Sequence, residues 1–180
     1  MGEAITERDS LPVMTTLGVT TLISDSGVTR YRVNTEEWMM YDRKKPSYWA
    51  FEKGVYMEQF DSIFNVEASI KADTAYYYDK ERLWKLIGNV DIQNRKGERF
   101  NTELLYWNEA TQKVYSDKFI RIQQPDRIIT GHGFDSNQQM TIYTIRNIEG
   151  IFYVDEEASS GPPQPETKAL PDSVNKDSAK

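Results

Sequence analysis

The sequence predicts an all-β protein: an antiparallel sandwich, jelly roll or barrel built from many short strands. Three observations support this. Apolar and polar residues alternate with a period of two, most clearly over Phe64–Ala72, as a half-buried strand requires. Turn-forming residues interrupt the alternation roughly every 8 to 12 residues. Evidence for helix is confined to Thr35–Met40, where the pattern allows one helical turn.

Ten further runs show the same alternation and are rich in Val, Ile, Thr, Tyr, Phe and Trp, which pack well on a pleated sheet. Asn, Asp, Gly and Pro lie between the runs, as in Ser24–Gly27 and Asn94–Gly97, and these residues favour chain reversal. We therefore expect further strands at Val13–Ile23, Val28–Asn34, Gly54–Phe60, Lys85–Gln93, Glu98–Trp107, Lys113–Ser116, Phe119–Gln123, Arg127–Thr130, Met140–Ile145 and Gly150–Val154.

A weak internal repeat indicates a fold of stacked hairpins. Tyr77-Tyr78-Asp79 recurs as Tyr106-Trp107-Asn108 about 29 residues further along, and a turn and a second strand follow each copy. Tyr41-Asp42 is a looser third copy. β-proteins also reuse hairpins by chance, but the matching offset favours a genuine repeat.

Length and composition favour one domain. A chain of 180 residues, 38% hydrophobic and 12% aromatic, is long enough to bury a core. Residues 155–180 hold four of the seven prolines and no aromatic residue, so they bury too little apolar surface to offset their ordering entropy. We expect a disordered lead over residues 1–12, one domain over residues 13–154 and a disordered tail over residues 155–180.

Charge and cysteine content argue against several functions. A net charge of −6, with Lys and Arg scattered among acids, argues against nucleic acid as a partner. The absence of cysteine removes disulfides, thiolate metal sites and Cys nucleophiles. No stretch reaches the roughly 18 to 20 apolar residues that span a bilayer, and no signal peptide is evident. Because Met1-Gly2 is typical of an expression start, a native N-terminal anchor or signal could have been removed.

Catalytic chemistry has little support. The single histidine, His132, lies in Gly131-His132-Gly133, which we interpret as a turn with a structural imidazole. No second histidine completes a zinc set, and no nucleophile elbow or phosphate-binding loop occurs. The pair Glu36-Glu37 could serve glycoside hydrolysis, but 28 acidic residues make such pairs frequent by coincidence. We expect that the protein is not an enzyme, uses no cofactor and binds no metal ion.

The aromatic residues are more informative. Eleven Tyr, seven Phe and four Trp are present, with dense clusters at Tyr48–Phe51 and Tyr76–Tyr78. They could line a site for a sugar or an acyl chain, or they could fill a sandwich core and its rim. Composition does not decide between a solid core and two sheets held apart around a groove.

Five segments, in order and spacing, carry a resemblance to a known family: Tyr48–Phe51 with Gly54-Val55, Lys71–Ala75, Leu83–Val90, Phe100–Tyr106 and Gly131–Asn137. The second and third are similar to an Ala-x-x-Ala strand followed by a Gly-x-Val strand. The fourth is similar to the next repeat, and the fifth to a Gly-x-x-Phe-x-Ser segment. Together they resemble the LptC family over about residues 14–154, and residues 72–134 also resemble the OstA-type domain shared with LptA.

The resemblance implies a twisted, V-shaped β-jellyroll, open along one side and at both ends. It also implies a periplasmic carrier of lipopolysaccharide, attached to the inner membrane by an N-terminal anchor. Such a carrier receives lipid from an inner-membrane ABC transporter and passes it to an LptA-like bridge protein.

A groove between strands would shield the acyl chains, since each CH2 exposed to water costs about 0.8 kcal/mol, while sugars and phosphates protrude. Candidate lipid-lining residues are Phe51, Val66, Ala68, Ile70, Leu86, Val90, Ile92, Phe119, Ile142 and Phe152. Core packing is the competing interpretation for each.

Assembly requires unpaired strand edges, which recruit other chains by strand addition. The resemblance implies that the C-terminal edge, around Thr141–Tyr153, meets the bridge protein. It implies that the N-terminal edge, around Val13–Ile23, meets the transporter, with a tight turn at Gly131 beside that edge. Such edges also allow edge-to-edge self-association. Candidate edge residues are Leu17, Val19, Gly131, Tyr143, Ile145 and Tyr153.

Two other functions remain open. A carbohydrate-binding or adhesion module would have a solid sandwich core and would bind free glycan through exposed aromatic residues. A lipocalin-like carrier of small apolar ligands would need a closed barrel with a deep cup, which the hairpin repeat fits poorly.

Overall fold

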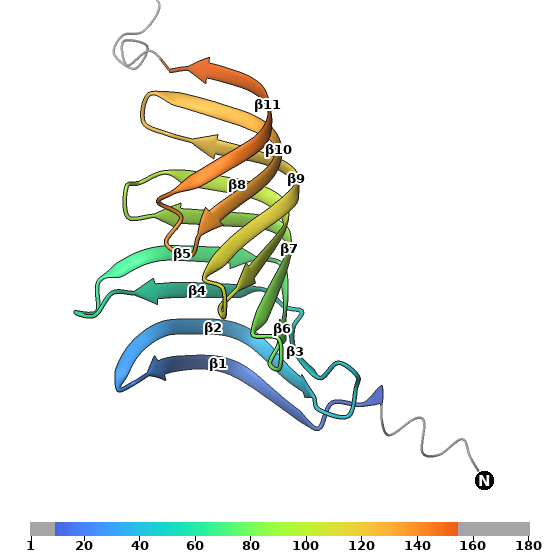
Figure 1. Ribbon diagram of the computed structural model, residues 1–180. Coiled ribbons are helices and arrows are strands. Elements are labelled where there is room, and N and C mark those ends of the chain that lie inside the picture. The colour runs from blue at the N-terminus through green and yellow to red at the C-terminus, as the bar shows by residue number, and fades with distance from the viewer. Residues whose placement is uncertain (1–9, 155–180) are drawn as a thin grey trace, which may run out of the picture.

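Residues 10–154, the part of the chain described by the computed structural model, form one antiparallel sheet of eleven strands folded into a twisted V (Figure 1). The predicted all-β jellyroll is therefore confirmed. The predicted tail and most of the predicted lead lie outside the described residues. The strands are β1 (Met14–Asp25), β2 (Val28–Tyr41), β3 (Tyr48–Phe51), β4 (Val55–Phe60), β5 (Val66–Ala72), β6 (Thr74–Tyr78), β7 (Leu83–Asn94), β8 (Arg99–Asn108), β9 (Lys113–Gln123), β10 (Arg127–Asn137) and β11 (Tyr143–Tyr153).

The sheet is a meander in which the chain adds strands from one end to the other. Strands β3 and β4 act as one long strand, because both pair with β2. Strands β5 and β6 act as another, because both pair with β7. Strand β1 therefore lies at one end of the stack and β11 at the other (Figure 1).

Each long strand bends near its middle, and the bends form a crease that divides the sheet into two leaves. Leaf A contains β4, β5 and the part of β2 that pairs with β4, Tyr31–Thr35. Leaf B contains β3, β6 and Met39–Tyr41 of β2. Register shifts accompany the bends in β7 to β10, and Gly88 and Gly133 have positive φ there. An extra residue on one strand bends it in this way.

The turns lie along the two free edges of the leaves, which we call rim A and rim B. Rim A holds the turns at residues 26–27, 61–65, 95–98 and 124–126, and rim B those at residues 42–47, 79–82, 109–112 and 138–142. The two copies of the predicted repeat occupy equivalent places on rim B. Each ends its turn with a positive φ, at Arg82 and at Gln112.

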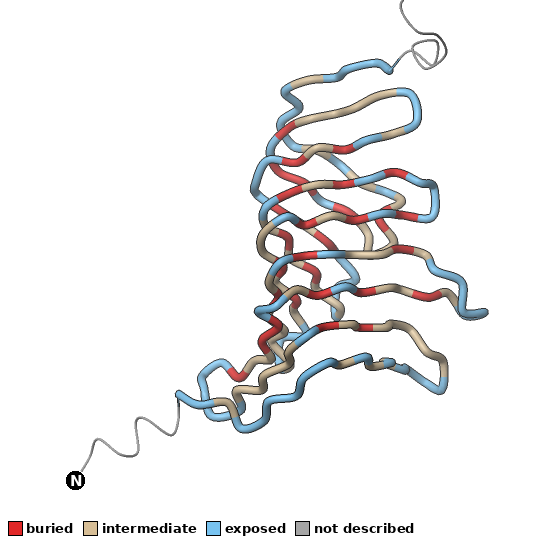
Figure 2. The backbone as a smooth tube through the Cα atoms, turned by 180° about the vertical axis from the view of Figure 1, so that it is seen from behind, coloured by how far each residue is buried: buried red, intermediate tan, exposed pale blue. Residues whose placement is uncertain are grey.

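The core lies between the leaves and is built from the inward-facing residues of both. Figure 2 shows that buried residues recur along the central strands, whereas the strands at the two ends are mostly exposed. The largest fully buried side chains are Trp84, Phe100, Phe134, Leu86, Ile92, Leu105, Ile120, Ile122 and Met140.

Several predicted elements were wrong in detail. Thr35–Met40 is not helical, because it continues β2 across the crease. The two predicted strands within residues 113–123 are one strand, β9, and those within residues 140–154 are largely one strand, β11. The segment Gly131-His132-Gly133 is not a turn: it lies within β10 at a bulge.

Candidate functional site

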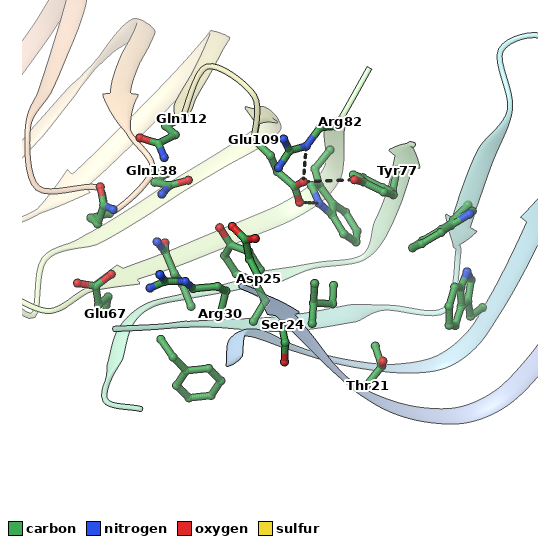
Figure 3. Close-up of a pocket in the computed structure, with 18 residues that line it drawn as sticks. Thr21, Ser24, Asp25, Arg30, Glu67, Tyr77, Arg82, Glu109, Gln112 and Gln138 are labelled. Atoms are coloured by element: carbon green, nitrogen blue, oxygen red, sulfur yellow. Dashed lines mark hydrogen bonds and ion pairs between the residues drawn. The ribbon is translucent and has the colours of Figure 1, made fainter. Parts of the chain in front are cut away.

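A groove opens between the two leaves at the β1–β2 end of the sheet, with a cavity of about 600 Å³ (Figure 3). Strands β1, β2, β4 and β5 contribute its leaf A wall, and β2, β3, β6 and β7 its leaf B wall. Polar side chains from both rims surround the mouth, including Asp25 and Arg30 on one side and Gln112 and Gln138 on the other. The site is therefore amphipathic.

Aromatic rings form the wall of the groove on leaf B. The ring of Trp49 lies 5.0 Å from the rings of both Trp38 and Tyr77, measured between centroids, and Tyr77 lies 4.6 Å from Trp84. Successive side chains of a strand point to opposite faces, so only alternate rings reach the groove. Trp49 and Tyr77 face the groove, whereas Tyr48 points outward and stacks on Tyr41. The wall offers a broad apolar surface.

Glu109 holds this wall in position from rim B. Its carboxylate accepts hydrogen bonds from Trp84 Nε1 at 2.9 Å and from the Tyr77 hydroxyl at 3.2 Å, and it pairs with Arg82 Nε at 3.6 Å (Figure 3). Burial and the nearby Glu109 charge raise the pKa of Tyr77 to about 12. The tyrosine is therefore a neutral donor at any physiological pH.

Two indole N–H groups near the groove have no hydrogen-bond partner. They belong to Trp38, which lines the cavity, and to Trp107, whose ring packs edge-on against Tyr31 at 5.0 Å. A buried donor left unpaired costs about 1–3 kcal/mol. A ligand with acceptor oxygens could satisfy such a donor.

Towards β11 the leaves pack directly on each other. The Phe100 ring on leaf A lies 5.7 Å from Phe134 and 5.1 Å from Tyr143, both on leaf B. Met140, from the rim B loop between β10 and β11, is fully buried. The groove is thus open at the β1–β2 end and filled at the other.

A comparison with family profiles matches residues 13–151 to the family described as lipopolysaccharide-assembly, LptC-related. The match covers well over half of the chain. The chain belongs to the LptC family. A search of curated proteins finds no match.

The LptC family is a periplasmic component of lipopolysaccharide transport and is not known as an enzyme family. Among residues 10–154, no helix is long and apolar enough to cross a membrane. Within the same residues, no cluster of His, Asp and Glu side chains is arranged to hold a metal ion.

Six of the ten predicted lipid-lining residues face the interior of this LptC-family fold. Phe51, Leu86, Val90 and Ile92 are packed in the core. Ala68 and Ile70 border a second, very small cavity that Tyr31 and Trp107 also line. Contact between lipid and any of these residues stays a prediction.

The other four predicted lining residues lie away from the groove interior. Phe119 and Phe152 alternate with inward-facing neighbours and point outward, Phe119 against the His132 ring. Val66 is half-exposed at the start of β5. Ile142 is exposed in the rim B loop.

The predicted edge residues separate into two groups. Leu17 and Tyr153 are exposed on the end strands β1 and β11, and Val19 is half-buried on β1. Tyr143 and Ile145 belong to β11 but pack against the core.

The expected position of Gly131 was wrong. It lies in β10 beside β11, at the opposite end of the sheet from β1. A Cβ there would come within 2.3 Å of the Asn147 carbonyl oxygen, so glycine is needed for close strand packing rather than for a turn.

The sequence interpretation missed the groove wall as a site. Trp38, Trp49, Tyr77 and Trp84 were not among the proposed lining residues, although Trp49 and Tyr77 lie in the two aromatic clusters. Alternation within each cluster was the signal that could have found these two, since every second residue of a strand shares a face.

Proposed function

We propose that this LptC-family chain carries lipopolysaccharide with its acyl chains in the groove between the leaves. It takes the lipid from an inner-membrane ABC transporter and passes it to an LptA-like periplasmic bridge protein. The observation that supports this is the aromatic-walled cavity at the β1–β2 end, with polar rims on both sides of its mouth.

The chemistry of the cavity matches an amphipathic ligand. Its volume of about 600 Å³ falls within the roughly 300–1,000 Å³ typical of ligand sites. Each acyl CH2 that moves from water to the aromatic wall gains about 0.8 kcal/mol. The charged and amide side chains of the rims suit the sugars and phosphates, which stay in water.

The two end strands support the proposed partners. Within the described residues, β1 pairs only with β2, and β11 only with β10. The free side of each strand therefore offers unpaired backbone groups to a partner strand. We assign β11 to the bridge protein and β1 to the transporter, with the membrane anchor preceding β1.

Photo-crosslinking tests lipid binding with two neighbouring positions on β3. A crosslinker at Trp49 faces the groove, and the matched control at Tyr48 faces outward. We expect lipopolysaccharide to be captured at Trp49 only. Equal capture at both positions rejects the groove, and capture of free glycan as efficiently as of acylated lipid supports a carbohydrate-binding module instead.

Crosslinkers on the end strands test the partners. We expect one at Tyr153 to capture the bridge protein and one at Leu17 to capture the transporter. Reversed capture overturns the assignment, and capture of a second copy of this chain at both positions indicates self-association.

A further inference from the structure

The two rims are joined by a cluster of side chains, which we call the clasp: Asn94, Glu98 and Gln124 on rim A, and Met140 and Tyr143 on rim B. The Tyr143 hydroxyl donates to the Glu98 carboxylate and accepts from Gln124 Nε2 at 2.6 Å. Asn94 Nδ2 donates to the Met140 carbonyl at 2.8 Å. These contacts close the mouth of the V in its β11 half.

Three of the five clasp residues are buried although the clasp consists mostly of polar groups, and Gln124 and Tyr143 are half-buried. Glu98 is 6% exposed, Asn94 7%, and Met140 not at all. Gln124 Nε2 and Asn94 Nδ2 also donate to the Glu98 carboxylate, at 3.0 and 3.1 Å. The carboxylate thus accepts hydrogen bonds from both rims: from Asn94 at the end of β7, from Gln124 after β9 and from Tyr143 at the start of β11.

Each half of the clasp is organised independently of the other. On rim A, Asn94 Oδ1 accepts from the backbone N–H groups of Lys96 and Glu98, both at 3.0 Å. On rim B, Asn137 Oδ1 accepts from the backbone N–H groups of Thr141 and Ile142 at 2.9 and 3.0 Å. The rims can therefore separate as preformed units without loss of any strand pairing.

The free energy of opening the clasp differs from that of separating two purely apolar surfaces, because the clasp also contains a charge and two amides. Separation breaks the hydrogen bonds across the mouth, exposes Met140 and parts the ring of Phe100 from that of Tyr143. It also returns the Glu98 charge and two amides to water, which offsets part of the loss because burying a charge is costly. A closure of this composition is poised to open when an acyl chain replaces the contacts of Met140.

We propose that the clasp is a gate on the lipid path, which the acyl chains of lipopolysaccharide must part to move from the β1–β2 cavity towards β11. This rests on the proposed function. Gln138 and Gln139 line the cavity, and the next residue of the same loop is the buried Met140. The filled half of the V lies between the cavity and the β11 edge, so the clasp separates the two.

A chemical lock across the rims tests the gate. Lys96 Nζ donates to the Thr141 carbonyl at 3.3 Å across the mouth, and the chain has no cysteine. The double variant Lys96→Cys/Thr141→Cys, joined by a short cleavable bis-maleimide, therefore holds the rims together. The matched control is Asp61→Cys/Arg95→Cys, which joins two neighbouring turns of rim A, where Arg95 Nη2 pairs with Asp61 Oδ2 at 3.0 Å, and leaves the mouth free.

The readout is capture of lipopolysaccharide by photo-crosslinkers on either side of the clasp, at Trp49 in the cavity and at Ile151, which pairs with the core-packed Ile129. We expect the locked protein to capture lipid at Trp49 as before, to lose capture at Ile151, and to regain it when the linker is cleaved. The rim A control should capture lipid at both positions.

Capture at Ile151 that persists in the locked protein overturns the gate while leaving the proposed function intact. Absence of capture at Trp49 in the unmodified protein overturns the proposed function and, with it, the gate. A second variant, Tyr143→Phe, removes the hydroxyl but keeps the ring, and we expect it to raise capture at Ile151 relative to Trp49. An unchanged ratio in that variant also counts against the gate.

Discussion

The guanidinium of Arg146 on β11 lies directly over Gly133 of β10. It crosses that strand to β9, where Nη2 donates to the Ser116 carbonyl at 2.6 Å and to Asp117 Oδ1 at 2.7 Å. A Cβ on Gly133 would approach Arg146 Nε to 2.4 Å. Because β11 is an end strand with one free side, this crossing side chain ties it to the third strand of the stack.

The first prediction concerns that crossing. We expect Gly133→Ala to weaken the attachment of β11, because alanine is strained at a φ of +78° and because its methyl group displaces Arg146. The strain alone costs about 1–2 kcal/mol. Hydrogen exchange of the β11 amides should accelerate more than that of the β5 amides.

The control for this prediction is Gly27→Ala. Gly27 has a φ of +80° in the β1–β2 turn, with open space where the Cβ would lie. Gly27→Ala should carry the backbone strain of a positive φ without a steric clash. Its effect on hydrogen exchange should be confined to the β1–β2 end of the sheet. Equal exchange of β11 amides in the two variants would contradict the proposed role of Arg146.

The second prediction compares two buried tryptophans. Trp84 and Trp107 are 2% and 4% exposed, but Trp84 Nε1 donates to Glu109 whereas Trp107 Nε1 has no partner. We expect Trp84→Phe to lower the free energy of unfolding by about 1–3 kcal/mol more than Trp107→Phe, because only the first leaves a partner group unsatisfied. Urea unfolding of both variants measures the difference. Equal losses of unfolding free energy would show that the loss depends on ring volume alone and not on the hydrogen bond.

Strand positions could be predicted wherever one face is buried, but their lengths could not. Polar residues at Asp117-Lys118 divide β9 into two apparent runs. The structure keeps them in one strand, because a bulge at the crease lets both point to solvent. Thr35–Met40 shows the same effect, since the bend in β2 disturbs the alternation and imitates a helical turn. Bulges depend on pairing with distant strands, which local patterns do not reveal.

The groove was predictable as a property of the fold family but not residue by residue. Phe119 and Phe152 are as apolar as their inward neighbours Ile120 and Ile151, and a shift of one residue in register moves a side chain to the other face. The clasp was missed altogether. Glu98 and Tyr143 lie 45 positions apart, and only the closure of the V brings them together.

The third prediction concerns the pH dependence of the clasp. Burial by itself would raise the pKa of Glu98, but hydrogen bonds from Tyr143, Asn94 and Gln124, with the nearby Lys96 charge, outweigh burial and lower it. A lowered folded-state pKa stabilises the fold above the ordinary value of 4.5, and that contribution is lost as the pH falls through the folded-state value. We expect Glu98→Gln to show a shallower loss of stability in acid than the unmodified protein.

At the alkaline end the sign reverses. Burial, followed by the hydrogen bond to Glu98 and its charge, raises the pKa of Tyr143 to about 12. The tyrosine therefore contributes stability that is complete below pH 10, the ordinary value, and is lost as the pH rises through about 12. Unfolding free energies of the protein and of Tyr143→Phe across this range measure it, and parallel curves would show that the hydroxyl has no such role.

The last prediction concerns the unpaired Trp38 N–H at the groove. Trp38→Phe keeps an aromatic ring on the wall and removes the donor, so the free protein avoids the cost of an unsatisfied group while a lipid oxygen loses a partner. One neutral hydrogen bond is worth about 0.5–1.5 kcal/mol, which corresponds to roughly a two- to tenfold weaker affinity for lipopolysaccharide. Trp49→Phe is the control, since Trp49 also lines the cavity but carries no buried unpaired donor. Calorimetric titration of both variants separates the two effects: a selective loss in Trp38→Phe identifies the indole N–H as a contact of the bound lipid, and equal losses identify ring area alone.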